Sequence, residues 1–142
     1  GESGGFSTFA GYERVITVLQ GDGMTLRVDG QDTPPLLPLE PFAFSGESRV
    51  TCTLLGGPIR DFNLIYAPQR YYARLQWLAG EQQFFSSAGT VLIFSVTDEL
   101  VVKVGNSASQ LGRHDCLQLG GNTGLLEVSS NGPCCVIELT AR

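Results

Sequence analysis

Apolar and polar residues alternate along most of the chain in stretches of about four to seven residues, the spacing of strands with one buried face. Gly, Pro, Asp and Asn residues separate these stretches. Almost no stretch has the periodicity of an amphipathic helix. The predicted strands cover residues 14–19, 24–28, 41–44, 50–54, 59–66, 91–96, 100–104, 116–119, 125–128 and 135–140. The pattern therefore predicts an all-β protein.

Four segments are less definite. Residues 33–38 carry three prolines and are expected to be irregular or at a sheet edge. Residues 105–110 are small and polar and are expected to form a loop. The aromatic-rich segment 70–85 is compatible with a strand, a short helical turn or a connecting arm. Residues 1–5 match the G-x-S-x-G expression, but no strand precedes the serine, so a flexible N-terminal stretch is expected.

The pattern of the first half recurs in the second half. Residues 26–28 lie 76 positions before the similar 102–104, Gly46 lies 74 before Gly120, and residues 57–64 lie 75 before 132–139. Three nearly equal offsets favour a duplicated unit over a chance alignment of apolar and glycine positions. The predicted organisation is a first half at 1–68, a connecting arm at 69–88 and a second half at 89–142, in one compact unit. Each half could close as a small barrel or pack as a sandwich.

Composition and charge exclude several classes of protein. The 142 residues are 42% hydrophobic, which excludes a disordered chain. The formal net charge is −5, and Lys103 is the single lysine, so nucleic acid is not an expected partner. The apolar runs are too short to span a bilayer, and no membrane partner is expected. No signal peptide is visible, so the cytoplasm is the expected location.

The cysteines and the single histidine make a metal or cofactor site unexpected. Cys52, Cys116, Cys134 and Cys135 lie in apolar surroundings and contain no CxxC pair. They are interpreted as reduced core thiols, with a reactive or disulfide role as the alternative. His114 alone cannot complete the usual zinc, iron or copper sites. We therefore expect neither a metal ion nor a cofactor.

The segment Arg60-Asp61-Phe62-Asn63 carries the most informative polar residues. On a strand, Arg60 shares a face with Phe62, whereas Asp61 and Asn63 share the other face. A guanidinium at the rim of a barrel binds a carboxylate through two parallel hydrogen bonds. The alternative is an internal ion pair of Arg60 with Asp61 or Glu138.

Two further residues are candidates. Arg14 opens the first predicted strand and permits the same two interpretations as Arg60. His114 is interpreted as a surface or rim residue, with ligand contact or catalysis as alternatives. Asp115 follows His114 directly, so a strand would turn the two side chains to opposite faces.

Three motifs resemble those of a known family. They are Phe6-Ser7-x-Phe9-x-Gly11-Tyr12-x-Arg14, Pro41-Phe42-x-Phe44-x-Gly46 and Leu55-x-Gly57-Pro58-x-Arg60-Asp61-Phe62-Asn63-Leu64. On these motifs the chain is similar to the HutD/Ves family, closely over residues 6–66 and more loosely to residue 141. Members of that family usually begin with an additional segment containing a tryptophan and a Lys-Asn-Gly-Gly-Gly-like stretch. This chain lacks both features, so any pocket wall that they provide is missing from the prediction.

The resemblance implies a fold and a function. The fold would be a bicupin, two cupin-like antiparallel β-barrels in one chain. The function would be to regulate or limit histidine utilisation in bacteria without catalysing a step. The implied ligand is a small carboxylate such as urocanate or N-formylglutamate. Metal-binding cupins carry several histidines, which this chain lacks.

Together, the residues and the resemblance predict a cytoplasmic, metal-free bicupin that binds a small carboxylate. Arg60 would clamp the carboxylate, Asn63 and Asp61 would orient or support it, and Arg14 would add positive potential. His114 would be a minor contributor. Because Arg60 faces away from Asp61 and Asn63 on a regular strand, one pocket would need a β-bulge or a strand end.

Two alternatives from other classes stay open. One is a metal-free isomerase or hydrolase that uses His114 with Asp61 or Glu138 as acid and base. The other is a protein-interaction module, and a homodimer would be one form of it. Its exposed aromatic patch would consist of Tyr71, Tyr72 and Trp77.

Overall fold

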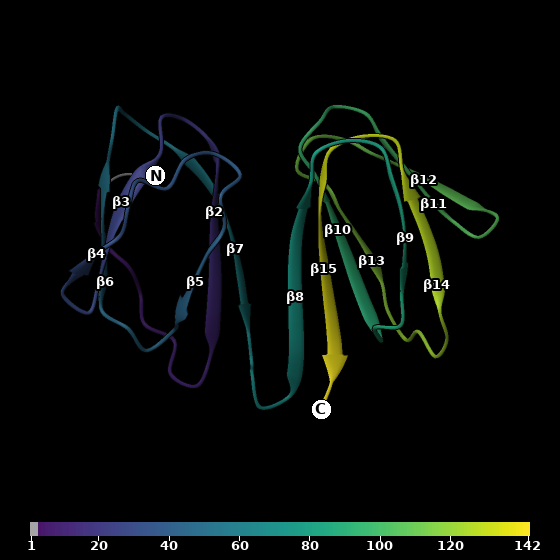
Figure 1. The fold of residues 1–142 in the computed structure, drawn as a ribbon, viewed down its shortest axis with the longest axis horizontal. Helices are drawn as coiled ribbons and strands as arrows, with labels where there is room; N and C mark the ends of the chain where they lie inside the picture. Colours follow the sequence, from purple (N-terminus) through teal and green to yellow (C-terminus); the bar gives the residue numbers. More distant parts are fainter. Residues whose placement is uncertain (1–2) are drawn as a thin grey trace. The chain divides into compact units, whose positions relative to one another are not determined.

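The computed structural model describes residues 3–142 and shows strands and no helix over that range. It divides into two compact units, the first ending at Pro68 and the second running from Gln69 to Arg142 (Figure 1). The boundary of the first unit lies where the sequence predicts it. Residues 69–88 are not a separate arm, because they supply two strands to the sheets of the second unit.

The first unit consists of two antiparallel sheets. One contains β1 (Gly4–Gly5), β6 (Val50–Leu54), β3 (Met24–Val28) and β4 (Gln31–Asp32), in that order. The other contains β5 (Phe42–Ser45), β2 (Glu13–Gln20) and β7 (Arg60–Tyr66). An apolar core is formed by buried side chains: Ile16, Val18, Met24, Leu26, Leu36, Phe44, Val50, Cys52 and Ile59.

The second unit also consists of two antiparallel sheets. One contains β13 (Cys116–Leu119), β10 (Thr90–Ser95), β15 (Cys134–Ala141) and β8 (Tyr71–Leu78). The other contains β12 (Ser107–Leu111), β11 (Leu100–Val104), β14 (Leu126–Ser130) and β9 (Gln82–Ser86). Its core consists of Ala88, Val91, Ile93, Leu100, Val102, Leu111, Val128, Cys134 and Val136.

The two units have the same strand order. The order β1-β6-β3-β4 matches β9-β14-β11-β12, and β5-β2-β7 matches β13-β10-β15, with β8 as the additional strand of the second unit (Figure 1). Even the alternation of buried and exposed positions along β3 and β11 is the same. The predicted duplication is thus confirmed, and the fold is the predicted all-β bicupin.

Strands with strong apolar alternation have the predicted bounds. β3, β6, β11 and β13 begin and end at the predicted residues. The hairpin between β3 and β4 turns at Asp29 and Gly30, whose φ angles of 49° and 84° are those of a type I′ turn. Left-handed φ angles at both positions explain why Asp-Gly predicts this corner.

Two segments differ from the prediction, and in a third, residues 70–85, the structure decides between the alternatives. Residues 107–111 form β12 rather than a loop, because an edge strand of small polar residues needs no apolar alternation to pair with β11. The segment 70–85 becomes β8 and β9, pairing with β15 and β14. At the N-terminus, β1 pairs with β6, and the Ser3 hydroxyl accepts a hydrogen bond from the Leu54 N–H at 3.1 Å. Residues 3–5 are therefore ordered, whereas Gly1 and Glu2 lie outside the described residues.

Over residues 3–142 the four cysteines form no disulfide with one another. Cys52, Cys134 and Cys135 are buried as predicted, but Cys116 is exposed because it begins the edge strand β13. Burial raises the pKa of the Cys134 and Cys135 thiols. Over residues 3–142 there is no helix long and apolar enough to cross a membrane.

Candidate functional site

The register between β2 and β7 sets which side chains meet in the first unit. Arg14 lies opposite Ile65, and Ile16 lies opposite Asn63. Residues paired across antiparallel strands point to the same side of a sheet, and alternation adds Asp61 to that side. Since Ile16 belongs to the core, Arg14, Asn63 and Asp61 lie on the face of the sheet that covers the core.

Arg14 is a buried arginine, with 7% of its surface exposed. Its Nη2 donates a hydrogen bond to Asn63 Oδ1 at 2.9 Å, and its Nη1 donates to the Ser7 carbonyl at 3.1 Å. Its Nε is buried and has no hydrogen-bond partner among the described residues. The guanidinium is thus fixed by two contacts from segments that are distant in the sequence.

Three phenylalanine rings surround this guanidinium. The Cζ atom lies 5.3 Å from the ring centroid of Phe6, 5.2 Å from that of Phe9 and 5.0 Å from that of Phe44. Ring faces attract a cation, and they leave few water contacts around it. The rings therefore favour the charged form of Arg14 without neutralising it.

Gly46 explains how the Phe9 ring comes close to Arg14. The Phe9 N–H donates to the Gly46 carbonyl at 2.7 Å, and the Gly46 N–H donates to the Tyr12 carbonyl at 2.7 Å. A Cβ atom at position 46 would lie 2.5 Å from the Phe9 carbonyl oxygen, which is too close for any other residue type. The glycine is therefore needed where residues 9–12 cross the end of β5.

A hollow of about 350 Å³ opens beside the guanidinium. We call it the Arg14 hollow, and its lining includes Phe6, Phe9, Arg14, Asp61, Asn63 and Ile65. It lies along the face of β7, an edge strand of its sheet. A small ligand can reach it without opening the core.

The charge of Arg14 is not balanced by an ion pair within residues 3–142. Burial lowers its pKa, and the charge of Asp61 acts in the opposite direction. An arginine nevertheless remains protonated in proteins. The first unit thus presents a fixed and largely buried positive group beside an open hollow, an arrangement whose chemistry suits a carboxylate.

Arg60 lies elsewhere. It is exposed at the start of β7, opposite Gln20 and beyond a β-bulge that follows Val18. It is not among the residues that line the Arg14 hollow. The structure thus joins Asp61 and Asn63 to Arg14, and the alternation that separates them from Arg60 is as predicted.

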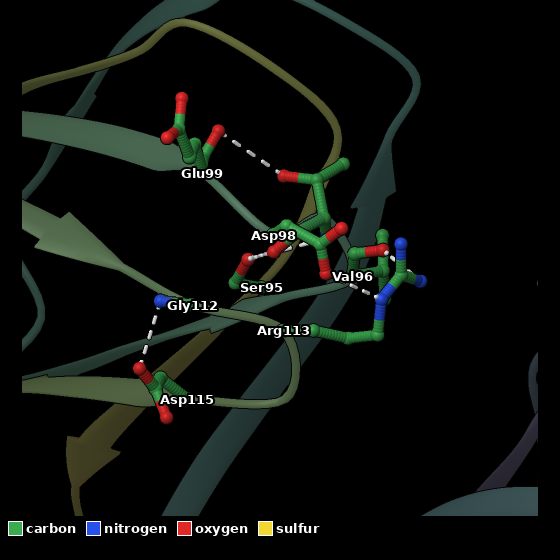
Figure 2. Close-up of polar contacts among 8 residues, drawn as sticks. Ser95, Val96, Asp98, Glu99, Gly112, Arg113 and Asp115 are labelled. Carbon is green, nitrogen blue, oxygen red and sulfur yellow. Dashed lines mark hydrogen bonds and ion pairs between the residues drawn. The ribbon is translucent and has the colours of Figure 1, made fainter.

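His114 belongs to a turn of the second unit. Figure 2 shows the contacts that hold this turn. The Gly112 N–H donates to Asp115 Oδ2 at 2.8 Å, and Arg113 Nε donates to Asp98 Oδ1 at 3.0 Å. His114 itself has a φ of 65°, a left-handed conformation that the surrounding turn imposes.

The contacts of His114 do not bring it to a catalytic acid of its own unit. Its ring stacks on Phe94 with centroids 5.7 Å apart, on the sheet face opposite to Glu138. Glu138 instead accepts a hydrogen bond from the Ser86 hydroxyl at 2.7 Å and lies 4.0 Å from Arg74 Nε. His114 is also not among the residues of the Arg14 hollow.

The aromatic residues of β8 do not form one patch. Tyr71 and Trp77 point to one side of the strand and Tyr72 to the other. Trp77 packs edge-on against Phe94 with centroids 6.3 Å apart, and Arg142 lies over the Tyr72 ring.

A larger hollow of about 650 Å³ lies in the second unit, beside Lys103, Gln83 and Ser129. None of its lining residues is a buried charged side chain, in contrast to Arg14 in the first unit. Over residues 3–142 no group of three or more His, Cys, Asp or Glu side chains is placed to hold a metal ion.

Sequence reasoning missed the ring cage, although one signal for it is present. Phe6 and Phe9 precede Arg14 at short spacing, and Phe44 lies in the second motif. Their approach depends on the pairing of β2 with β5, which places Phe44 opposite Arg14. No local pattern reveals that pairing.

The family model that matches this chain is HutD, over residues 1–136. The chain belongs to the HutD family. It is 61% identical over 142 residues to an uncharacterized protein in the hutC 3′ region of Pseudomonas putida, covering 99% of this chain and 75% of that protein.

Solved structures agree with the family assignment. HutD from Pseudomonas fluorescens SBW25, in a formate condition, has a TM-score of 0.90 and 65% identity, covering 100% of this chain and 75% of that one. A conserved protein of unknown function from Pseudomonas aeruginosa PAO1 has a TM-score of 0.96 and 49% identity, covering 100% and 79%. AerE from Microcystis aeruginosa, at 11% identity and a TM-score of 0.64 over 99% and 81%, shares the fold alone.

Proposed function

We propose that this protein is a non-catalytic receptor for a small carboxylate and that ligand binding regulates or limits histidine utilisation. Urocanate and N-formylglutamate are the candidate ligands. The observation that carries the proposal is Arg14, a buried guanidinium without an ion-pair partner in the described chain, beside an open hollow.

The hydrogen-bond inventory of Arg14 supports carboxylate binding. A guanidinium has five N–H donors, of which Ser7 and Asn63 take one each. Because Asn63 accepts through Oδ1, its NH₂ group is left as a donor on the other branch of the amide. A carboxylate entering the hollow would therefore meet donors from both Arg14 and Asn63, and charge-assisted hydrogen bonds of this kind are strong.

The relatives support the biological part of the proposal. The Pseudomonas putida relative lies in the hutC 3′ region, and the solved HutD structure comes from a formate condition. Formate is the smallest carboxylate, so it is a suitable minimal probe for the Arg14 hollow.

Calorimetric titration tests the proposal with two matched variants. Formate, urocanate and N-formylglutamate are titrated into the unaltered protein, Arg14→Met and Arg60→Met. Both variants lose one positive charge, but only Arg14 lines the hollow. We expect Arg14→Met to weaken binding of each ligand at least 30-fold, in line with about 2 kcal/mol or more for a charged hydrogen-bonded contact, and Arg60→Met to change it less than about threefold.

The reverse result, with loss only in Arg60→Met, would make Arg60 the clamp. Absence of binding to the unaltered protein would contradict the proposal altogether. Circular dichroism of each variant establishes that the fold is retained.

A further inference from the structure

Among residues 3–142, Asp61 is the one carboxylate that lines the Arg14 hollow. It shares the face of β7 with Asn63, two residues further along the strand, and two residues span about 6.6 Å. Asp61 is exposed, and it lines the same hollow as Arg14 without forming an ion pair with it. The hollow therefore carries one positively and one negatively charged side chain.

This arrangement is unfavourable for a plain carboxylate. An anion held by Arg14 and Asn63 would place a second negative charge in the same hollow as Asp61, where the dielectric constant is lower than in water. It would also displace water from the Asp61 carboxylate without replacing the hydrogen bonds. A ligand N–H directed at Asp61 removes both costs, because the carboxylate then accepts a charge-assisted hydrogen bond.

We propose that Asp61 makes the Arg14 hollow selective for carboxylates that also carry an N–H donor, such as an amide, an amine or a nitrogen heterocycle. The N–H would lie about 6.6 Å from the carboxylate, the length of two residues along a strand. This inference rests on the proposed carboxylate-binding function. It adds a requirement that carboxylate binding alone does not impose: the ligand is recognised at two ends, by Arg14 at its anionic group and by Asp61 at its N–H.

Two planar acids of similar shape isolate the N–H group. Urocanate carries an imidazole ring with an N–H, and 3-(2-furyl)acrylate carries a furan ring without one. Both are titrated into the unaltered protein, Asp61→Asn and Glu99→Gln. Glu99 is an exposed carboxylate of the second unit outside the hollow, so Glu99→Gln reproduces the change of net charge alone.

We expect the unaltered protein and Glu99→Gln to prefer urocanate by about tenfold, the size of a hydrogen bond to a charged group. Asp61→Asn should bind urocanate more weakly and furylacrylate more tightly, which reduces the preference below threefold. If Asp61→Asn changes the affinity for both acids equally and in the same direction, the inference is overturned. Asp61 would then act only through its charge and not through a hydrogen bond to the ligand. If both acids bind equally to the unaltered protein and both depend on Arg14, the inference fails while the proposed function stands.

If neither acid binds the unaltered protein, the proposed function fails, and the inference fails with it. Because Asp61 is exposed, Asp61→Asn is not expected to affect folding. Thermal unfolding of that variant without ligand verifies this expectation.

Discussion

The two units have the same order of strands around their cores, but they differ in the charged residue that lies beside the core. The burial patterns of β2 and β10 align Arg14 with Val91. Arg14 lies beside Phe44 and Ile65, whereas Val91 lies beside Leu119 and Glu138. In the first unit a cation occupies the strand that contributes to the core. In the second unit that position is apolar, and the charged residue is a carboxylate on the neighbouring strand.

The charges of Glu138 and Arg14 differ in their partners. Glu138 has partners within its own unit, because it accepts the Ser86 hydroxyl and lies near Arg74. Arg14 has ring faces, one carbonyl and one amide, and no carboxylate ion pair within the described chain. A charge satisfied inside the protein contributes to the structure, whereas a charge without a counter-ion is available to a ligand. The comparison therefore favours the first unit as the place of the proposed binding.

The largest expected effect tests whether the two cores are equivalent. Ile16 and Ile93 are fully buried at corresponding positions of β2 and β10. We expect Ile16→Ala and Ile93→Ala each to lower the free energy of unfolding by about 2–5 kcal/mol, because each leaves a cavity in a packed core. Urea unfolding measures both values. A loss under about 1 kcal/mol in only one unit would show that the duplicated cores are not equivalent.

The next effect concerns the hydrogen bond between Ser86 and Glu138 in the second unit. Ser86→Ala removes the hydroxyl that donates to Glu138, and both groups are largely shielded from water. We expect the free energy of unfolding to fall by about 1–3 kcal/mol, the cost of leaving a buried acceptor without its donor. The same urea experiment measures it. Since Ser86 also accepts the Ala88 N–H, Ser86→Thr is the control that keeps the hydroxyl.

These residues also show how far sequence reasoning reaches. The repeat, the central strands and the separation of Asp61 and Asn63 from Arg60 follow from periodicity, because they depend on local alternation. The edge strand β12 does not, because small polar residues carry no such pattern. The Arg14 cage depends on the pairing of β2 with both β5 and β7, which joins residues 30 to 50 positions apart. Long-range register is not encoded in any one window of the sequence.

A smaller effect should appear at alkaline pH, at Cys135 of the second unit. Burial raises the pKa of the Cys135 thiol well above its ordinary value, and the nearby Cys134 and Cys116 act in the same direction. A raised thiol pKa means that folding favours the neutral form. The stabilisation is therefore complete below the pKa of the unfolded thiol, near 9, and is lost progressively as the pH rises above it.

At pH 10 the loss from Cys135 should be about 1.4 kcal/mol relative to pH 8. Urea unfolding at the two pH values measures it, and Cys135→Ala should show a smaller difference between them. An identical difference in the variant would mean that Cys135 does not titrate on unfolding in this range.

The smallest expected effect on stability is that of Arg14→Met. It tests whether Arg14 supports the fold or is available to a ligand in the Arg14 hollow. The substitution removes two hydrogen bonds and three ring contacts, but it also removes a buried charge and an Nε–H without a partner. Methionine fills similar space and packs well against aromatic rings. Because replacing a buried charge by an apolar side chain is often neutral, we expect unfolding free energies within about 1 kcal/mol of each other. A loss above about 3 kcal/mol would show that Arg14 supports the fold as Glu138 does, and the contrast between the two units would then no longer identify a binding site.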